Sequence, residues 1–190
     1  MICVVVYAQK PDYPAQLLAG ALSRYGRVEL HLSSSLTASG DGEAEYRVEA
    51  VSRLEKLMLP GSVLMAADRT APHRLELDDG VIVVTGAENR RIHRLLRGRA
   101  NPLITCGTGL RDTLTLSSTD GQRALLCAQR QLPTVTGEWL EPFEFSVQLY
   151  RCSMRWALLA AGAAAVCGCD LSRGDMMLGG ESEKQTLTAP

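Results

Sequence analysis

Four short runs of mostly apolar residues constrain the fold of this 190-residue chain more than any other feature. They lie at residues 2–7, 62–67, 80–84 and 101–106. Continuous apolar runs of this length are typical of strands that are buried on both faces of a parallel sheet. Parallel neighbours need long crossover connections, which are usually helices. The sequence therefore predicts an α/β fold.

Three further segments have the apolar spacing of helices. Residues 12–25 repeat leucines at helical intervals, and we expect Asp12 to cap this helix, with Pro14 in its first turn. Residues 43–59 predict an amphipathic helix. Residues 151–168 are rich in alanine and apolar almost all round, as in a helix with little exposed surface.

Alternating apolar and polar residues predict an antiparallel section. Residues 111–117, 123–129 and 141–149 alternate in this way, and Asp120-Gly121 is a hairpin signal between the first two. The predicted fold class is α/β: a three-layer, Rossmann-like arrangement of a mostly parallel sheet with helices on both faces, and an antiparallel β section near residues 111–149. The small, polar residues 33–42 are predicted as a loop.

Composition and length bound the domain count and the environment. Apolar residues make up 46% and charged residues 22%, with a net charge of -1, so no global basic excess points to nucleic acid. We expect one domain over residues 1–170 and a loosely ordered tail over residues 171–190, with some order around residues 176–178. The apolar run 156–169 is too short to span a membrane, and residues 1–10 lack the features of a signal peptide. We therefore expect a cytoplasmic protein.

The motifs of metal, disulfide and nucleotide chemistry are missing. Six cysteines are present, but Cys167-Gly168-Cys169 is a C-x-C without a second pair at zinc-ribbon spacing. Neither a Walker A motif nor a G-x-G-x-x-G that opens a helix occurs. We assign no catalytic residue, metal site or cofactor from the sequence.

Residues 80–118 predict where a ligand binds. They form a strand, a turn, a short basic helix, a strand and a second turn, and folds of this kind bind ligands at the carboxyl edge of the sheet. We expect seven residues of the two turns to line a crevice there: Thr85, Gly86, Glu88, Asn89, Cys106, Gly107 and Thr108. The alternative is that they only build the turns, because Thr85 and Glu88 match a T-x-x-E capping box.

The short helix after the first turn carries a basic cluster, with arginines at positions 90, 91, 94, 97 and 99 and with His93. A solvated helix face explains such a run. The alternative is a surface formed by Arg90, Arg91, Arg94 and Arg97 that docks a protein partner. No aromatic residues interleave with the arginines, so we do not expect nucleic acid to bind.

From residue 80 to about residue 170, the order of elements resembles the second half of the central domain of the Mur ligase family. The corresponding pieces are VIVVTGAEN, PLITCGTG, RDTLTLSS with RALLCAQ, and WALLAAGAAAVCGCD. The resemblance implies an α/β core from a family of ATP-dependent amide-bond ligases, of the cell-wall and folylpolyglutamate type.

Several parts of the family pattern are absent from this chain. The lysine-bearing phosphate loop, the carboxylates and histidine that hold magnesium, and the C-terminal ligase domain have no counterpart. Thr85-Gly86 replaces the Asn-Asp turn that the family brings to adenine, and Tyr150-Arg151-Cys152 replaces its His-Asn pair. Without a phosphate cradle and a metal, charge on a transferred phosphoryl group would not be stabilised.

We therefore expect a non-catalytic, Mur-ligase-like protein that binds a small ligand, such as a nucleotide, or a partner protein at the carboxyl edge of its sheet. One alternative is a small enzyme that uses Cys106 or Asp112 as its reactive group. Another is a subunit of a larger assembly, docked through the basic helix.

Overall fold

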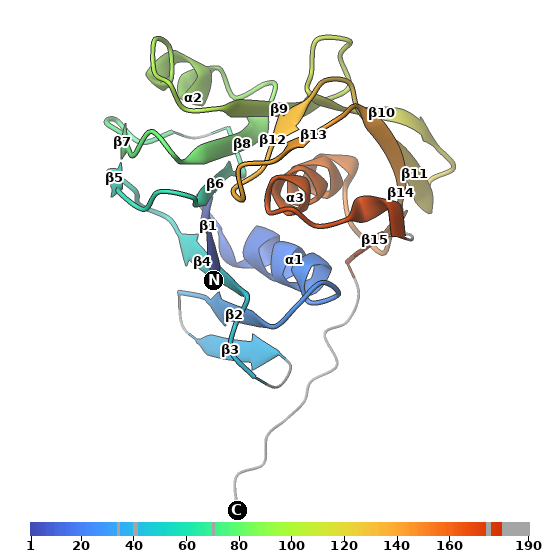
Figure 1. The fold of residues 1–190 in the computed structure, drawn as a ribbon, viewed down its shortest axis with the longest axis horizontal. Helices are drawn as coiled ribbons and strands as arrows, with labels where there is room; N and C mark the ends of the chain where they lie inside the picture. The colour runs from blue at the N-terminus through green and yellow to red at the C-terminus, as the bar shows by residue number, and fades with distance from the viewer. Residues whose placement is uncertain (34, 40–41, 70, 174–175, 180–190) are drawn as a thin grey trace, which may run out of the picture.

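The structure is a computed structural model that describes residues 1–190 except 34, 40–41, 70, 174–175 and 180–190 (Figure 1). Within this described part, eleven strands form one sheet in the order β15-β14-β11-β10-β9-β8-β6-β1-β4-β2-β3. Their bounds are β1 (Ile2–Tyr7), β2 (Val28–His31), β3 (Leu36–Ser39), β4 (Tyr46–Val51), β6 (Val63–Ala66), β8 (Ile82–Gly86), β9 (Leu103–Gly107), β10 (Leu114–Thr119), β11 (Arg123–Ala128), β14 (Phe143–Leu149) and β15 (Met176–Leu178).

Two of these strands, β3 and β11, run against the other nine. The four apolar runs of the sequence became β1, β6, β8 and β9, which are parallel neighbours in the sheet. The β10–β11 hairpin turns at Asp120 and Gly121, and β14 pairs antiparallel with β11. The mostly parallel sheet and its antiparallel section are therefore confirmed.

Helices cover both faces of the sheet. The sheet curves around α1 (Asp12–Leu22) and α3 (Met154–Val166), which lie side by side on its concave face (Figure 1). On the other face, α2 (Arg90–Leu95) packs through Ile92 into a second apolar cluster, next to the pair β5 (Lys56–Leu57) and β7 (Glu76–Leu77). A hairpin of β12 (Leu132–Pro133) and β13 (Trp139–Leu140) lies against α3. This is the predicted three-layer arrangement.

The prediction of a helix at residues 43–59 is wrong. The segment contains β4, which inserts between β1 and β2 and pairs with both in parallel register. Tyr46 and Val48 face the core around α1, while Arg47 and Glu49 point to the opposite face of the sheet. The apolar residues after β4 pack as an irregular connection under the second cluster. Hydrogen bonding to two neighbouring strands satisfies the backbone of β4 as fully as a helix would.

One end of the sheet also differs from the prediction. Residues 33–42 were predicted as a loop, but they contain β3, the edge strand beside β2. At the other edge, β15 pairs with β14, and Met176 and Leu178 are buried. Residues 180–190 of the predicted tail lie outside the described residues, and the domain boundary at residue 170 stays a prediction. No described helix has the length and apolar character that crossing a membrane requires.

Candidate functional site at the carboxyl edge of the sheet

The two turns that the sequence singled out lie next to each other. In the register of β8 and β9, Gly86 is opposite Cys106, and the amide of Ala87 donates to the carbonyl of Cys106 at 3.0 Å. The seven predicted residues are therefore gathered at one edge of the sheet, as expected. Their role in binding stays a prediction.

Two of the seven side chains, those of Thr85 and Asn89, form hydrogen bonds inside the protein. Thr85 is fully buried, and its hydroxyl donates to the carbonyl of Ala66 at 3.2 Å. The side chain of Asn89 accepts from the amide of Ile92 at 3.2 Å and donates to the carbonyl of Asp68 at 2.8 Å. Asn89 is thus the N-cap of α2. The predicted Thr85–Glu88 capping box is wrong, because the helix begins at Arg90, after both residues.

Two carboxylates occupy the space over the turns. A Cβ at Gly86 would lie 2.5 Å from Oε2 of Glu88, and a Cβ at Gly107 would collide with the carboxylate of Asp112. Oδ2 of Asp112 accepts from the amide of Gly109 at 2.8 Å, and Oε1 of Glu88 lies 2.7 Å from Nε of Arg155. Glycines at these two positions allow the side chains to approach the backbone closely. Thr108 is exposed at the rim.

Cys106 is buried beneath α3, where a Cβ on Gly162 would lie 2.9 Å from its Sγ. Burial raises the pKa of the Cys106 thiol far above its ordinary value, and the nearby carboxylates of Asp112 and Glu88 raise it further. A thiol in these surroundings stays protonated at neutral pH, whereas nucleophilic cysteines are thiolates in electropositive, accessible places. The chemistry of Cys106 therefore does not favour the enzyme hypothesis.

The turn from β1 into α1 offers few donors to an anion. Helix N-termini bind phosphate through free backbone amides. Here Pro11 and Pro14 have no amide hydrogen, Asp12 brings a negative charge to the first turn, and the amide of Gln9 donates to Oδ2 of Asp68 at 2.6 Å. Asp12 does not cap α1 as predicted, because Pro11 is the N-cap and the Asp12 carboxylate accepts from Ser33.

Sequence reasoning missed an aromatic and basic group at the start of α3. The rings of Tyr13 and Trp156 meet edge to face with centroids 6.3 Å apart, and the Arg155 guanidinium lies 5.0 Å from the Trp156 centroid. These contacts join the first turns of α1 and α3. The order of elements in the sequence contained a signal for this group. Both α1 and α3 follow a strand of the parallel set, so both helices start at the carboxyl edge of the sheet.

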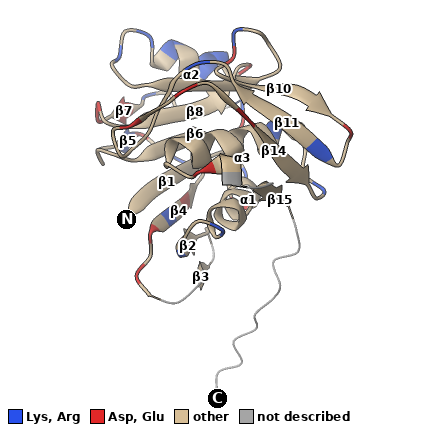
Figure 2. Ribbon diagram, turned by 45° about the vertical axis from the view of Figure 1, so that its right-hand side comes forward, with Lys and Arg blue, Asp and Glu red and all other residues tan. Residues whose placement is uncertain are grey.

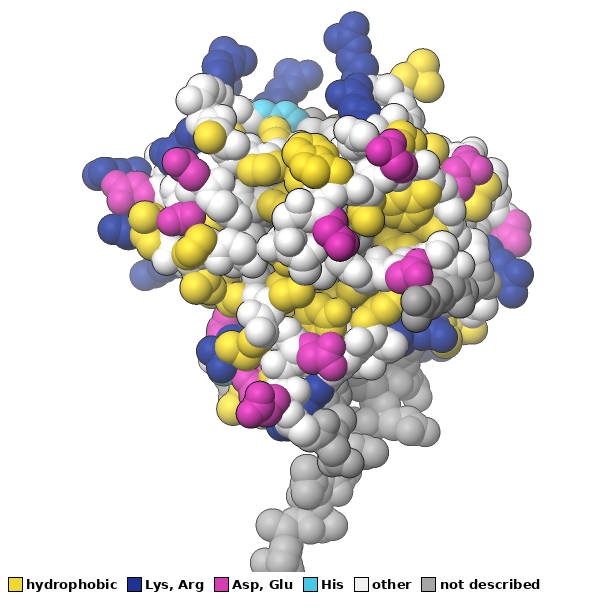
Figure 3. Space-filling model, viewed as in Figure 1, with side chains coloured by type: hydrophobic (Ala, Val, Ile, Leu, Met, Phe, Trp, Pro, Cys, Tyr) yellow, Lys and Arg dark blue, Asp and Glu magenta, His cyan; other side chains and the backbone are white. Residues whose placement is uncertain are grey.

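The three arginines of α2 and Arg97, which follows its C-cap Leu96, form a separate basic surface, which we call the α2 basic surface: Arg90, Arg91, Arg94 and Arg97. All four are exposed, and none forms a side-chain hydrogen bond or ion pair with the described part of the chain. Figure 2 shows basic residues of α2 together at one end of the molecule, and dark blue side chains project from the same end in Figure 3.

Metal-ligating side chains do not gather elsewhere. Over the described ranges, no three His, Cys, Asp or Glu residues are placed to hold an ion. All six cysteines are free thiols. Cys169 contacts the hydroxyl of Tyr46 at 3.7 Å, and burial raises the pKa of this thiol to about 11.

No protein-family model matches the sequence, and no curated protein is similar to it at the sequence level. Solved structures of ligases do share its fold. MurF from Acinetobacter baumannii matches over 94% of this chain and 46% of its own, with a TM-score of 0.57 and 9% identity. The UDP-N-acetylmuramate:L-alanyl-gamma-D-glutamyl-meso-diaminopimelate ligase from Neisseria meningitides matches over 90% and 63%, with a TM-score of 0.56 and 11% identity.

A UDP-N-acetylmuramoyl-L-alanyl-D-glutamate--2,6-diaminopimelate ligase matches over 90% of this chain and 44% of its own, with a TM-score of 0.54 and 11% identity. The fold of the chain is therefore Mur ligase-like, and the likeness extends well beyond residues 80–170. The chain spans about half the length of these proteins, between 44% and 63%. At this identity, the likeness establishes the fold alone.

Proposed function

We propose that this Mur ligase-like chain is a non-catalytic binding protein, which docks an acidic surface of a partner protein through the α2 basic surface. The observation that carries the proposal is a set of four exposed arginines, three on the six-residue helix α2 and Arg97 just after it, without ion pairs to the described part of the chain. The helix starts at the carboxyl edge of β8, where folds of this kind present their binding residues.

Several arginines elsewhere in the protein have partners, although exposed ones such as Arg53 and Arg130 do not pair with any described residue. Arg47 pairs with Glu29 at 3.2 Å, Arg155 pairs with Glu88, and Arg99 donates to the carbonyl of Leu75 at 2.7 Å. The whole chain has 20 basic and 21 acidic residues, so acids are not scarce. What distinguishes Arg90, Arg91, Arg94 and Arg97 is that four such arginines lie within eight residues, and this clustering supports complementarity to a molecule outside the chain.

The position of the charges in α2 supports the same conclusion. A helix dipole favours acids in the first turn and bases in the last. The first turn of α2 has no acid and holds Arg90 and Arg91, which destabilise the helix end. Burial of Ile92 in the second apolar cluster and the Asn89 cap hold the helix in place despite this cost.

A protein partner fits this surface better than nucleic acid. Single-stranded nucleic acid is held by aromatic side chains among the bases, and α2 contains none. A binding role, rather than phosphoryl chemistry, is supported by the proline-rich start of α1 and by the carboxylates over Gly86 and Gly107. Negative charge at these places opposes a bound phosphate.

The experiment compares two double variants with the same net charge, -3 instead of -1. Arg91→Gln with Arg94→Gln alters the α2 basic surface, and Arg53→Gln with Arg130→Gln removes two exposed charges elsewhere. Each protein is cross-linked in cells and also titrated with a polyglutamate peptide. We expect the α2 variant to lose the cross-linked partner and to bind the peptide about fivefold more weakly, since two exposed ion pairs contribute about 1 kcal/mol.

The control variant should keep both properties, and binding should weaken as salt rises. Equal loss in both variants would show that net charge alone acts, and the docking proposal would be abandoned. Nuclease treatment distinguishes a protein partner from nucleic acid. A cross-linked species that disappears with nuclease is a nucleic-acid complex, which contradicts a protein partner.

A further inference from the structure

We propose that the partner docked by the α2 basic surface is a second copy of this chain, bound through an acidic and aromatic surface around β13 and the start of β14. This inference rests on the proposed function and names its partner. We call the second surface the β13–β14 acidic surface: Glu138, Trp139, Glu141 and Glu144, which are all exposed. Trp139 belongs to β13 and Glu144 to β14, and the other two residues flank β13.

Trp139 is unusually exposed for a large apolar side chain. Its exposed fraction is 63%, the highest of any aromatic residue in the described ranges. The next residue, Leu140, packs against the core cluster, so the alternation of a strand turns Trp139 away from the core. Tryptophan is enriched among the residues that dominate protein interfaces, and arginine is the cation found most often over aromatic rings. Trp139 therefore suits a partner that presents arginines.

The three carboxylates around Trp139 have no basic partner among the described residues. Residues 131–150 contain neither lysine nor arginine. Nε2 of Gln131 donates to Oε1 of Glu141 at 2.7 Å, and the hydroxyl of Ser117 donates to Oε1 of Glu144 at 3.2 Å. Both donors are neutral, so these hydrogen bonds orient the carboxylates without cancelling their charge.

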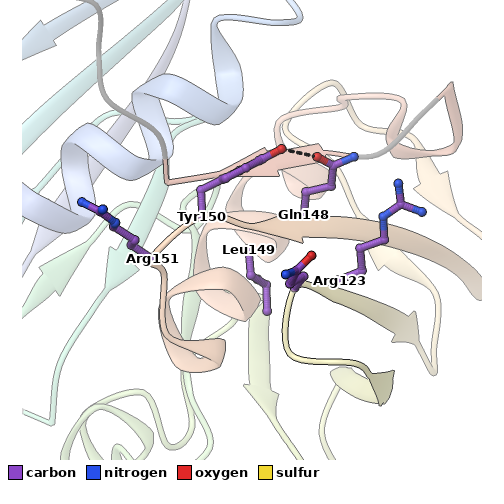
Figure 4. A pocket seen from close by; sticks show the side chains of 6 residues that line it. Arg123, Gln148, Leu149, Tyr150 and Arg151 are labelled. Carbon is purple, nitrogen blue, oxygen red and sulfur yellow. Dashed lines mark hydrogen bonds between the residues drawn. The ribbon is translucent and has the colours of Figure 1, made fainter.

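The bases closest in sequence do not compensate this charge. Arg130, which follows β11, forms no ion pair with any described residue. Arg123 and Arg151 lie at the far end of β14, where they line a pocket of ≈ 360 Å³ between the start of β11 and the end of β14. Their side chains point away from each other, and the hydroxyl of Tyr150 between them donates to Oε1 of Gln148 at 2.9 Å (Figure 4). The β13–β14 acidic surface thus keeps its negative charge.

The chain itself carries the complement of this surface. The α2 basic surface presents four guanidinium groups, and the β13–β14 acidic surface presents three carboxylates and an indole ring. A guanidinium group binds a carboxylate through paired hydrogen bonds and stacks on an aromatic face. Within one molecule the two surfaces form no ion pair with each other over the described ranges. A contact between two copies would therefore pair charges that the single chain leaves unpaired.

The proposed contact is heterologous, because two different surfaces of the chain meet. Each pair of copies then keeps one free α2 basic surface and one free β13–β14 acidic surface, so further copies add until a ring closes. The contact consists mainly of exposed ion pairs, which contribute little individually and are screened by salt. We therefore expect weak self-association that rises with protein concentration and falls with ionic strength.

The test uses two double variants of the full chain, each of which removes half of the contact. Arg91→Gln with Arg94→Gln alters the α2 basic surface, and Glu138→Gln with Glu141→Gln alters the β13–β14 acidic surface. Sedimentation velocity should show self-association of the parent protein with a dissociation constant between about 10 μM and 1 mM. Each double variant should associate at least tenfold more weakly. Trp139→Ala should do the same without any change in net charge.

A mixture of the two double variants tests the heterologous geometry directly. The α2 variant keeps its acidic surface, and the acidic-surface variant keeps its arginines. Mixing them should restore one contact and give a 1:1 complex that does not grow further, with an affinity close to that of the parent protein. A contact between identical surfaces, or attraction through net charge alone, would not produce this result.

Glu55→Gln with Asp79→Asn is the matched control, because it removes two exposed acids outside both surfaces. The proposal is overturned if the parent protein stays monomeric up to about 1 mM, if the mixture forms no 1:1 complex, or if the control variant loses as much association as the acidic-surface variant. If the parent is monomeric but a different protein cross-links through α2 in cells, the docking proposal stands and only this inference fails. Loss of both results would overturn both proposals.

Discussion

Gly162 lies where α3 crosses the carboxyl ends of β8 and β9. A Cβ at this position would lie 2.9 Å from Sγ of Cys106, 3.3 Å from Cγ1 of Val84 and 3.5 Å from Cδ2 of Leu114. The small side chains of α3 thus allow the helix to pack closely on the sheet, and the strand beneath provides no room for one more carbon.

Replacement of Gly162 by alanine is predicted to destabilise the protein by about 1–3 kcal/mol, because overpacking forces the core to shift. Gly20 in α1 is the matched control, since nothing lies within 4 Å of its Cβ position. Gly20→Ala should stabilise by about 0.5–1 kcal/mol through helix propensity alone. Urea unfolding measures both changes. A Gly162→Ala protein as stable as Gly20→Ala would contradict the packing described here, and adding Cys106→Ala should relieve the clash.

The reactivity of Cys106 provides a prediction about the enzyme hypothesis. Burial raises the pKa of its thiol, so iodoacetamide at pH 8 should leave it unmodified in the folded protein. Cys127 is partly exposed on β11 and should react first. Mass spectrometry after partial alkylation locates the label. Modification of Cys106 ahead of Cys127 would restore a nucleophile at this edge of the sheet.

At the scale of the element, the stability and position of α2 depend on residues at its N-terminal end. The helix has six residues, and isolated helices of this length do not form in water. Its position comes from Ile92 in the apolar cluster and from Asn89, whose side chain caps the helix and also bonds to the loop after β6. The α2 basic surface is therefore presented by one capping residue and one buried anchor.

Asn89→Ala is predicted to destabilise the protein by about 1 kcal/mol through loss of the cap, and to weaken docking through α2. Asn89→Asp keeps the oxygen that accepts from Ile92 but loses the donor to the carbonyl of Asp68. It should show an intermediate effect. Amide hydrogen exchange in residues 90–95 reports the helix directly. If Glu88→Gln opens the helix as much as Asn89→Ala does, the assignment of the cap to Asn89 is incorrect.

For the molecule as a whole, buried thiols link stability to alkaline pH. Burial raises the pKa of Cys106 and of Cys167 above their ordinary value of 9.0. Above pH 9 the unfolded chain loses these protons while the folded chain keeps them, so the folded state becomes less stable as pH rises.

The free energy of unfolding is predicted to fall by about 1.4 kcal/mol per pH unit for each of the two thiols above pH 9. Urea titrations between pH 7 and about 10.5, in the presence of a reductant, measure the slope. Cys106→Ala should reduce this slope, whatever its effect on stability at pH 7. An unchanged slope would mean that the Cys106 thiolate is tolerated in the folded protein.

At the scale of the whole fold, an element was predictable where its sequence pattern is compatible with only one kind of secondary structure. Runs such as residues 2–7 bury both faces of a strand, and the alanine-rich segment at residues 151–168 suits only a closely packed helix, so local residues determined these elements. The sequence pattern of residues 46–51 is compatible with either a helix or a strand. The open positions beside β1 and β2 decided for a strand, because pairing with both neighbours satisfies its backbone.

The sequence by itself determined that the turns after β8 and β9 meet at one edge, because parallel strands end together. Only the tertiary structure decided what occupies that edge. Glu88 and Asp112 lie over the glycines, α3 seals Cys106, and the pocket between β11 and β14 brings together residues from two separate strands. These outcomes depend on how side chains from distant parts of the chain pack in the same space. The local sequence pattern contains no information on that packing.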